Sequence, residues 1–253
     1  MNLKNISSIV TGGASGLGAA TAKILAAAGA RVSIFDVNEE LARKTADSIG
    51  AVAFPCDVAD EDSVKNALTL STQQNGVVRI LVNCAGVGGS SRIVGKNGPM
   101  SLESFEKVIR INLVGTFNMM RLVAEHMIAS GPTTENERGV IISTVSVAAY
   151  EGQIGQAAYA ASKGGIASLT LPAAREFAQF GIRVNAIAPG LFETPLMDDL
   201  SEDTKKSLSA SIPFPKRLGL ASEFAKLVLH IIDNTYINGE VIRIDGALRM
   251  QSK

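Results

Sequence analysis

The chain has 253 residues, and its formal net charge is zero because 24 Lys and Arg balance 24 Asp and Glu. Hydrophobic residues make up 46% and charged residues 19% of the chain, which excludes a disordered polymer and provides the apolar material for one large α/β domain. Without an overall positive field, the chain is not expected to bind nucleic acid as its main ligand.

Short β-branched runs alternate with longer helical patterns along the chain. We expect strands at residues 6–11, 31–36, 51–56, 79–83, 140–146, 183–189 and 241–244. Helices are expected at 16–28, 39–48, 60–73, 102–128 (as one helix or two), 159–180 and 222–233. Strict alternation predicts an α/β fold of Rossmann type, a doubly wound parallel sheet of about seven strands with helices on both faces. No linker or repeat divides it, so residues 1–253 are predicted to form a single domain.

Three longer segments interrupt this rhythm, at residues 88–99, 132–138 and 192–218. Ligands bind beyond the carboxyl ends of the strands in such a sheet. The first and third segments follow strands, so we expect them on the active side. The second precedes a strand and is predicted to be a solvated loop on the opposite side.

The few cysteines and histidines argue against disulfides and metal sites. Cys56 and Cys84 follow separate strands, and His126 and His230 lie in separate helical segments. No uncharged apolar run approaches the roughly 18 residues of a membrane span. The first predicted strand begins at residue 6, so a cleavable targeting peptide is not expected. We therefore predict a soluble protein of the cytoplasm, or of the mitochondrial matrix in a eukaryotic cell.

The segment TGGASGLG at residues 11–18 joins the first predicted strand to the first predicted helix. Its glycines permit a tight turn and a close approach to a pyrophosphate, and the helix N-terminus offers free N–H groups. We interpret the segment as a nucleotide-binding loop rather than an ordinary turn, with contacts from Gly12, Ser15, Gly16, Leu17 and Gly18.

Asp36 ends the second predicted strand, where a carboxylate can accept hydrogen bonds from ribose hydroxyls and repel a 2′-phosphate. The neighbouring residues Ala14, Ser15, Val37 and Asn38 supply no cation for such a phosphate. The predicted cofactor is therefore NAD rather than NADP. The alternative is that Asp36 only caps the next helix.

Further nucleotide contacts are expected where the third and fourth strands end. Asp57 and Val58 could flank an adenine, and the small residues around Asn83, Ala85 and Gly86 would let the chain pass close to a ribose. Each of these segments could also be an ordinary loop.

Tyr159 and Lys163 are four residues apart, which places them on one face of a helix. A free phenol, with a pKa of about 10, is a poor base, and we expect the nearby ammonium to lower that pKa. Tyr159 could then exchange a proton with a substrate while hydride moves to or from nicotinamide, and Lys163 could bind the ribose. The alternative is an amphipathic helix with the tyrosine inside and the lysine outside.

Three other polar residues are candidates for the same site. Ser146 ends the fifth strand and could orient a substrate carbonyl. Asn112, among apolar neighbours, could hold a water behind Lys163 or cap a helix kink. Gln153 could bind a thioester oxygen.

Several motifs follow one another along the chain. They are TGGxxGxG, NxAG, Asn112 in the fourth helical region, Ser146, YxxxK and a Pro-Gly after the sixth strand. With this pattern the chain resembles the short-chain dehydrogenase/reductase family over nearly its whole length, although Cys84 replaces the second Asn of the usual NNAG. The resemblance implies a catalytic tetrad of Asn112, Ser146, Tyr159 and Lys163. It also implies that the loops described above hold NAD(P).

The resemblance further implies a nicotinamide loop at Pro189, Gly190, Leu191 and Thr194, with Thr194 at the carboxamide. Thr194 and Pro195 would equally suit the start of a helix.

The stretches SVAAYEGQIGQAAYAASKGGI, RVNAIAPGLFETPL and INGEVIRIDGALRM resemble the 3-hydroxyacyl-CoA dehydrogenase branch of this family. That resemblance implies NAD-dependent, reversible oxidation of a 3-hydroxyacyl-CoA to a 3-ketoacyl-CoA, with a small-molecule acyl-CoA substrate and a homotetramer. One alternative is another activity of the family, either 3-ketoacyl-acyl-carrier-protein reductase or hydroxysteroid or alcohol dehydrogenase. Another is a non-catalytic nucleotide-binding scaffold, against which the complete tetrad argues.

Residues 192–218 form a connection long enough to be predicted as a substrate lid. Its apolar side chains could hold an acyl chain; they are Leu196, Met197, Leu200, Leu208, Ile212 and Phe214. Its cations could meet CoA phosphates or simply face solvent; they are Lys205, Lys206, Lys216 and Arg217. The helices predicted at 102–128 and 159–180 are long and apolar enough to pair subunits.

Overall fold

The computed structural model describes residues 1–133, 136–197 and 201–252. These residues build a parallel sheet in the strand order β3-β2-β1-β4-β7-β8-β9. Its strands are β1 (Ser7–Thr11), β2 (Arg31–Asp36), β3 (Val52–Pro55), β4 (Val78–Asn83), β7 (Gly139–Thr144), β8 (Ile182–Pro189) and β9 (Val241–Ile244). A short antiparallel pair, β5 (Val94–Gly95) and β6 (Gly98–Pro99), lies apart from it. The predicted doubly wound fold is confirmed.

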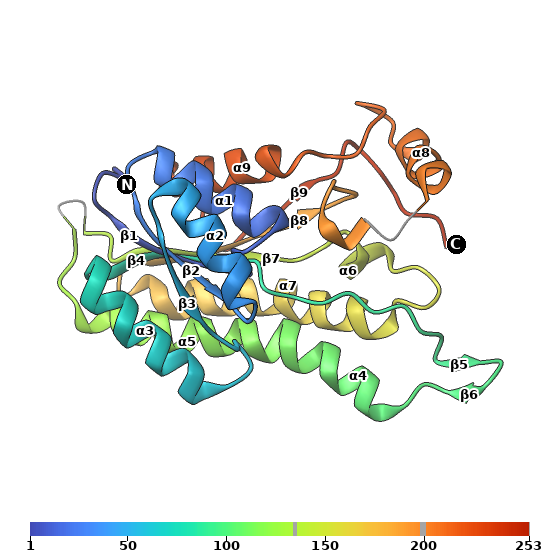
Figure 1. The fold of residues 1–253 in the computed structure, drawn as a ribbon, viewed down its shortest axis with the longest axis horizontal. Helices are drawn as coiled ribbons and strands as arrows, with labels where there is room; N and C mark the ends of the chain where they lie inside the picture. Colours follow the sequence, from blue (N-terminus) through green and yellow to red (C-terminus); the bar gives the residue numbers. More distant parts are fainter. Residues whose placement is uncertain (134–135, 198–200, 253) are drawn as a thin grey trace.

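Helices cover both faces of the sheet (Figure 1). One face carries α1 (Gly16–Ala27), α2 (Glu39–Ile49) and α9 (Ala221–Asp233), and the other carries α3 (Glu61–Asn75), α5 (Gly115–Ala129) and α7 (Ala157–Ala178). Successive strand residues point to opposite faces, so Ile9 packs beneath α3 and α5 while Val10 packs beneath α1 and α9. Both faces are therefore buried, which explains the continuous apolar runs of the strands.

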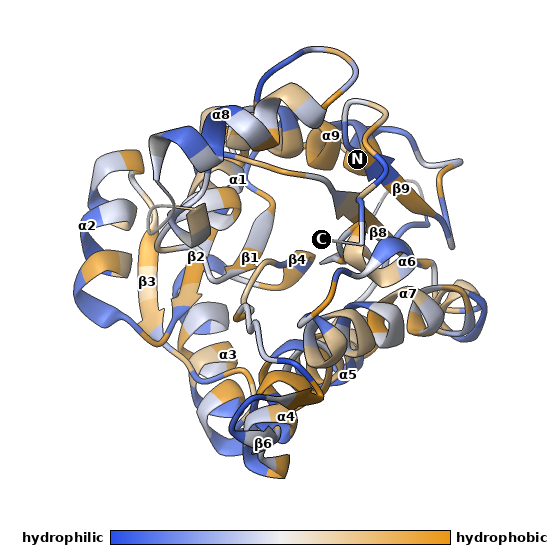
Figure 2. Cartoon of the chain, turned by 90° about the vertical axis from the view of Figure 1, so that its right-hand side faces the viewer, coloured by the Kyte–Doolittle hydropathy of each residue, from blue (hydrophilic) through white to orange (hydrophobic). Residues whose placement is uncertain are grey.

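The predicted helical stretch at 102–128 is one continuous run with an irregular middle. It consists of α4 (Leu102–Ile109), a π-helical turn η1 (Arg110–Val114) and α5. Three short elements lie near the carboxyl ends of the strands: α6 (Ala148–Glu151), the 3₁₀ turn η2 (Pro195–Met197) and α8 (Glu202–Ser211). Figure 2 views the molecule from this end, with α8 on one side of the opening and α4 on the other.

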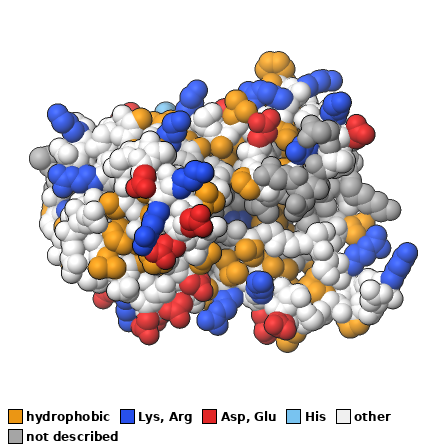
Figure 3. Space-filling view, viewed as in Figure 1, with side chains coloured by type: hydrophobic (Ala, Val, Ile, Leu, Met, Phe, Trp, Pro, Cys, Tyr) orange, Lys and Arg blue, Asp and Glu red, His pale blue; other side chains and the backbone are white. Residues whose placement is uncertain are grey.

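The strand order reverses between β1 and β4, because β2 and β3 lie on one side of β1 and β7, β8 and β9 on the far side of β4. The connections after β1 and β4 therefore leave toward opposite faces and open a crevice, the usual ligand position in such a sheet. On the molecular face shown in Figure 3, basic and acidic side chains are interspersed, as the zero net charge leads one to expect.

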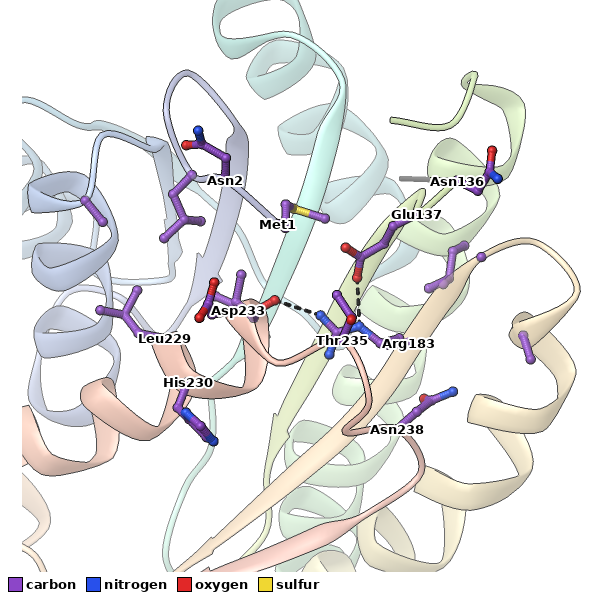
Figure 4. A pocket seen from close by; sticks show the side chains of 16 residues that line it. Met1, Asn2, Asn136, Glu137, Arg183, Leu229, His230, Asp233, Thr235 and Asn238 are labelled. Carbon is purple, nitrogen blue, oxygen red and sulfur yellow. Dashed lines mark hydrogen bonds and ion pairs between the residues drawn. The ribbon is translucent and has the colours of Figure 1, made fainter. Parts of the chain in front are cut away.

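A buried ion pair occupies the opposite end of the sheet, so the prediction of a solvated loop at 132–138 is wrong for Glu137. Its Oε1 accepts from Nε of Arg183 over 2.7 Å, and both side chains are 8% exposed. Arg183 also donates to the carbonyl oxygens of Ile231 and Ile232 at the end of α9, where a cation is favoured by the helix dipole. Figure 4 shows the pair beside a cavity of about 1170 Å³. Thr134 and Glu135 lie outside the described residues.

Candidate active site

The loop after β1 takes conformations that require glycine. Gly12 and Gly16 have φ angles of 62° and 54°, in the left-handed region. A Cβ on Gly18 would lie 2.1 Å from the carbonyl oxygen of Gly12. Helix α1 begins here without a hydrogen bond from the side chain of its cap residue Ser15 and without an acidic residue in its first turn. Its first N–H groups therefore suit an anion such as a pyrophosphate.

The loops after β1 and β4 are tied together at the crevice. The N–H groups of Cys84 and Ala85 donate to the hydroxyl of Thr11 over 3.2 and 3.1 Å. A Cβ on Gly12 would lie 2.7 Å from the nitrogen of Ala85, so glycine allows the two backbones to touch. Sequence reasoning missed this role of Thr11, although its place at the end of a strand before the glycines is a usable signal.

The loop after β8 closes on the same glycine turn. Gly190 follows Pro189 and donates its N–H to the carbonyl oxygen of Ile244 over 2.9 Å. Leu191 and Thr194 continue this loop toward α1, where a Cβ on Gly16 would lie 3.6 Å from the Cβ of Thr194. Pro195 begins the 3₁₀ turn η2, which agrees with the helix-start interpretation of Thr194 and Pro195, while a contact of Thr194 with the carboxamide stays a prediction.

The carboxylate of Asp36 links β2 to the glycine loop. It accepts from the N–H groups of Ala14 over 3.1 Å and Asn38 over 3.0 Å. The alternative that Asp36 caps the next helix is wrong, because Asn38 caps α2 by accepting from the N–H of Leu41. Asp36 therefore stands fixed beside the loop, where a dinucleotide fold binds ribose hydroxyls.

Asn83 at the end of β4 carries an unsatisfied polar atom. Its amide nitrogen donates to the hydroxyl of Ser143 over 3.2 Å, while its Oδ1 is buried without a hydrogen-bond partner. Buried acceptors are rarely left unpaired, so this oxygen fits a ligand that brings a donor, such as a ribose hydroxyl.

The loop after β3 places its two candidates differently. Asp57 is exposed and accepts from the N–H of Ala59 over 2.9 Å. Val58 is buried against α5, where a Cβ on Gly115 would lie 2.5 Å from its Cγ2. A rigid apolar wall at Val58 suits the face of a purine. Sequence reasoning missed Gly115, whose signal is a glycine inside an otherwise strong helix.

Ser146, Tyr159 and Lys163 meet at the carboxyl end of β7. Ser146 follows this strand, and its hydroxyl accepts from the N–H of Ala148 over 3.1 Å; its side chain lies near enough to Tyr159, in the first turn of α7, to lower the pKa of that phenol. Lys163 is 5% exposed, and its Nζ lies 5.8 Å from the centroid of the Tyr159 ring. The same Nζ donates to the carbonyl oxygen of Thr144 over 2.7 Å. The structure therefore brings together the three residues that the spacing singled out.

Burial dominates the protonation of this group. It raises the pKa of Tyr159, and the side chain of Ser146 opposes that rise. The expectation that the pKa of Tyr159 is lowered is therefore wrong in net effect, because loss of hydration is the largest influence on the phenol. Burial also lowers the pKa of Lys163 to about 8.

Asn112 is fully buried in the π-helical turn η1 and connects two parts of the site. Its Oδ1 accepts from the N–H of Val87 over 2.8 Å, and its Nδ2 donates to the Val87 carbonyl and to the hydroxyl of Ser162, each over 3.0 Å. These contacts join the loop after β4 to α7, while the capping of a helix kink and the holding of a water behind Lys163 both stay predictions for Asn112. A Cβ on Gly86 would lie 3.1 Å from Asn112 Oδ1 and 3.7 Å from Lys163 Nζ, so the backbone passes close to both.

Gln153 contacts the C-terminal segment. Its Nε2 donates to the carbonyl oxygen of Gln251 over 3.0 Å. The structure thus gives Gln153 a structural contact, and its binding of a thioester stays a prediction.

A cavity of about 930 Å³ lies between the glycine loop and α8, and Gly16, Thr194, Lys205, Lys206, Lys216 and Arg217 are among its lining residues. Arg217 pairs in bidentate fashion with Glu223, with both contacts at 2.8 Å, and this lowers the pKa of Glu223 to about 2. Of the predicted apolar lid residues, Ile212 is buried and Phe214 exposed. Leu200 and the side chain of Leu196 lie outside the described part of the chain.

Within residues 1–133, 136–197 and 201–252, no helix is both long and apolar enough to cross a bilayer. No group of three or more His, Cys, Asp and Glu side chains in the same ranges could hold a metal ion.

A doubly wound sheet with a glycine turn at its crevice and a Tyr–Lys pair beside it defines a nicotinamide-dependent oxidoreductase. The family model described as short chain dehydrogenase matches residues 7–205. The chain therefore belongs to the short-chain dehydrogenase family.

Particular relatives span almost the whole chain. It is 49% identical to the 3-hydroxyacyl-CoA dehydrogenase type-2 of Bos taurus, over 99% of this chain and 97% of the relative. It is 34% identical to the 3-oxoacyl-[acyl-carrier-protein] reductase FabG of Thermotoga maritima, over 98% and 99%. The crystal structure of 3-hydroxyacyl-CoA dehydrogenase type-2 from Mycobacterium avium superposes with a TM-score of 0.94 at 45% identity, covering 98% of each chain.

Proposed function

We propose that this protein is an NAD-dependent 3-hydroxyacyl-CoA dehydrogenase that reversibly oxidises the 3-hydroxyl group of an acyl-CoA to a ketone. The observation that carries the proposal is the cluster of Ser146, Tyr159 and Lys163 beside the glycine loop. The substrate class is supported by 49% identity to a protein named for this activity, over nearly the full length of both chains.

The cofactor would lie along the carboxyl ends of β1, β2, β4 and β8. The residues proposed to hold it are Gly12, Ser15, Gly16, Leu17, Gly18, Asp36, Asp57, Val58, Asn83, Ala85, Gly86, Tyr159, Lys163, Pro189, Gly190, Leu191 and Thr194. The carboxylate of Asp36 favours NAD, because it accepts from two hydroxyls and repels a 2′-phosphate. When bound, the nicotinamide accepts or supplies the hydride.

Tyr159 exchanges the proton with the substrate oxygen. In oxidation the alcohol proton passes to the phenolate of Tyr159, and in reduction the phenol returns it. Since burial raises the pKa of Tyr159, the phenol prevails at neutral pH and suits reduction, while oxidation gains as the pH rises. Ser146 donates a hydrogen bond to the same substrate oxygen. Lys163, when charged, stabilises the phenolate, and Asn112 positions the elements around it.

The cavity beneath α8 suits the phosphates of CoA, because Lys206 and Lys216 are among the cations that line it. Arg217 already pairs with Glu223, so it is a weaker candidate for binding a CoA phosphate than the sequence suggested. Reversing the charge of Lys206 and Lys216 together would raise KM for CoA esters and leave KM for a small ketone unchanged.

A substrate panel tests the proposal as a whole. Rates would be measured for 3-hydroxyacyl-CoA, hydroxysteroid and acyl-carrier-protein substrates, each with NAD⁺ and NADP⁺. We expect the largest kcat/KM for a 3-hydroxyacyl-CoA with NAD⁺. A larger value for a carrier-protein or steroid substrate would reject the proposed substrate, and comparable values for both nucleotides would reject the proposed cofactor.

A further inference from the structure

The C-terminal segment, residues 246–252, lies between α6 and α8 at the carboxyl end of the sheet (Figure 2). Its backbone makes hydrogen bonds with residues 151–154, which belong to the segment joining Ser146 to Tyr159. The N–H of Met250 donates to Glu151 Oε2, and the N–H of Ile154 donates to the carbonyl oxygen of Ser252, each over 3.0 Å. The Gln153 contact described above is the third bond of this set.

Glu151 is the centre of this attachment. Arg243, at the end of β9, approaches Glu151 Oε1 at 2.8 Å and also contacts Asp245 at 2.7 Å. Arg249 adds contacts to Glu151 at 3.3 Å and to Asp245 at 3.2 Å. Isolated exposed ion pairs contribute little, but this group is a network, and the carboxylates of Glu151 and Asp245 are only 21% and 9% exposed.

The other side of the same segment packs against the predicted lid. Leu248 is 3% exposed and lies in one apolar cluster with Ile212 and Leu218. The carbonyl oxygen of Gly246 accepts from the N–H of Phe214 over 3.3 Å. A Cβ on Gly246 would lie 2.7 Å from Cγ2 of Ile212, so the backbone at Gly246 packs directly against the Ile212 side chain.

We propose that residues 246–252 form a clasp that couples residues 201–218, the described C-terminal part of the predicted lid, to the segment joining Ser146 to Tyr159, with Glu151 and Arg243 as positioning residues. This inference rests on the proposed function for its kinetic consequences. An acyl-CoA bound against residues 201–218 would, through the clasp, fix the segment that holds the Ser146 side chain near Tyr159. Loosening the clasp would let Ser146 move away from the phenol of Tyr159, whose pKa its side chain lowers.

Two variants of the full enzyme test the clasp: Glu151→Ala, and a chain that ends at Leu248. We expect KM for acetoacetyl-CoA to rise, kcat/KM to fall roughly tenfold, and the alkaline limb of the pH profile to move upward. NADH affinity, measured by fluorescence titration, should stay unchanged. Hydrogen exchange should quicken both in residues 148–156 and in residues 205–218.

Glu61→Ala is the matched control. It removes a carboxylate that contacts Lys65 and Arg121 on the surface of α3, with no contact to the clasp. We expect wild-type kinetics and exchange from it. Glu151→Gln keeps an acceptor for the Met250 N–H but loses the charge, and should fall between Glu151→Ala and the wild type.

Unchanged exchange in residues 205–218 of both variants would overturn the coupling. A lower melting temperature with unchanged KM and pH profile would show a merely structural role and would also overturn it. If the wild type turns over no acyl-CoA, the proposed function fails, and the exchange measurement still decides whether the two segments are coupled.

Discussion

At the scale of single residues, the phenol of Tyr159 would, in the proposed mechanism, govern how the reaction depends on pH. Its pKa lies above the ordinary value, so its base form, which oxidation requires, grows as the pH rises through the neutral and alkaline range. We expect kcat/KM for oxidation to increase with pH while reduction stays flat near neutrality. Tyr159→Phe should lower kcat by about 10²- to 10⁴-fold and leave NADH binding intact. A variant that retains wild-type turnover would remove Tyr159 from the mechanism.

Lys163 makes a separate prediction about stability. Its pKa is about 8 in the folded protein against an ordinary 10.5, so between these values the unfolded chain binds a proton that the folded chain does not. Stability conferred by this site therefore rises with pH over that window and is lowest below pH 8. Urea unfolding of wild type and Lys163→Met at several pH values isolates this contribution. The difference between them should grow in favour of wild type from pH 8 to 10, and a constant difference would contradict the prediction.

Asp36 tests the choice of nucleotide. Asp36→Asn keeps one acceptor oxygen, which can serve only one of the N–H groups of Ala14 and Asn38, and removes the charge that opposes a 2′-phosphate. We expect the ratio of kcat/KM for NADP⁺ to that for NAD⁺ to rise by about tenfold, a change of about 1.4 kcal/mol. If the ratio does not move, the carboxylate does not discriminate between the nucleotides.

At the scale of elements, α5 would act on the proposed nucleotide site through a glycine. A side chain at Gly115 would meet Val58, so Gly115→Ala should displace the expected adenine wall. We expect KM for NAD⁺ to rise several-fold with kcat little changed, and stability to fall by about 1–3 kcal/mol. Gly164→Ala on α7 is the control, because a Cβ there meets nothing within 4 Å. It should leave KM unchanged and stabilise the helix by up to about 1 kcal/mol.

The elements that the sequence predicted well are those whose signal is local. The strand periods, the glycine turn after β1 and the Tyr159–Lys163 spacing are short-range patterns, and each appears in the fold where expected. What escaped prediction depends on residues distant in sequence. The partners of Asn112 come from the β4 loop and α7, and the pKa of Tyr159 depends on how deeply the folded chain buries it. Glu137 likewise gains its counter-ion from a strand 46 residues away.

At the scale of the whole molecule, the homotetramer stays a prediction. The described surface offers an apolar depression of about 420 Å³ between α5 and α7, lined by Leu113, Val114, Phe117, Gly165, Ser168 and Leu169. Val114 and Phe117 are 46% and 48% exposed there, and such patches often mark subunit contacts. These are the two helices that the sequence predicted to pair subunits.

Sedimentation velocity tests this expectation. The wild type should sediment well above its monomer mass of 26.4 kDa, and Phe117→Asp should shift it toward smaller species. Leu70→Asp, a comparable change at a 40% exposed leucine on α3, is expected to leave the assembly intact. A wild type that sediments as a monomer would contradict the tetramer.

The contact of Thr194 and Pro195 with Gly16 has a kinetic consequence. Thr194 and Pro195 would flank a dinucleotide whose phosphates lie at this turn, and an acyl-CoA bound in the cavity beneath α8 would lie over the same turn. Turnover should then follow a compulsory order, with the coenzyme arriving first and departing last. In product-inhibition experiments NADH would compete with NAD⁺ alone, and its departure would set the ceiling on the steady-state rate.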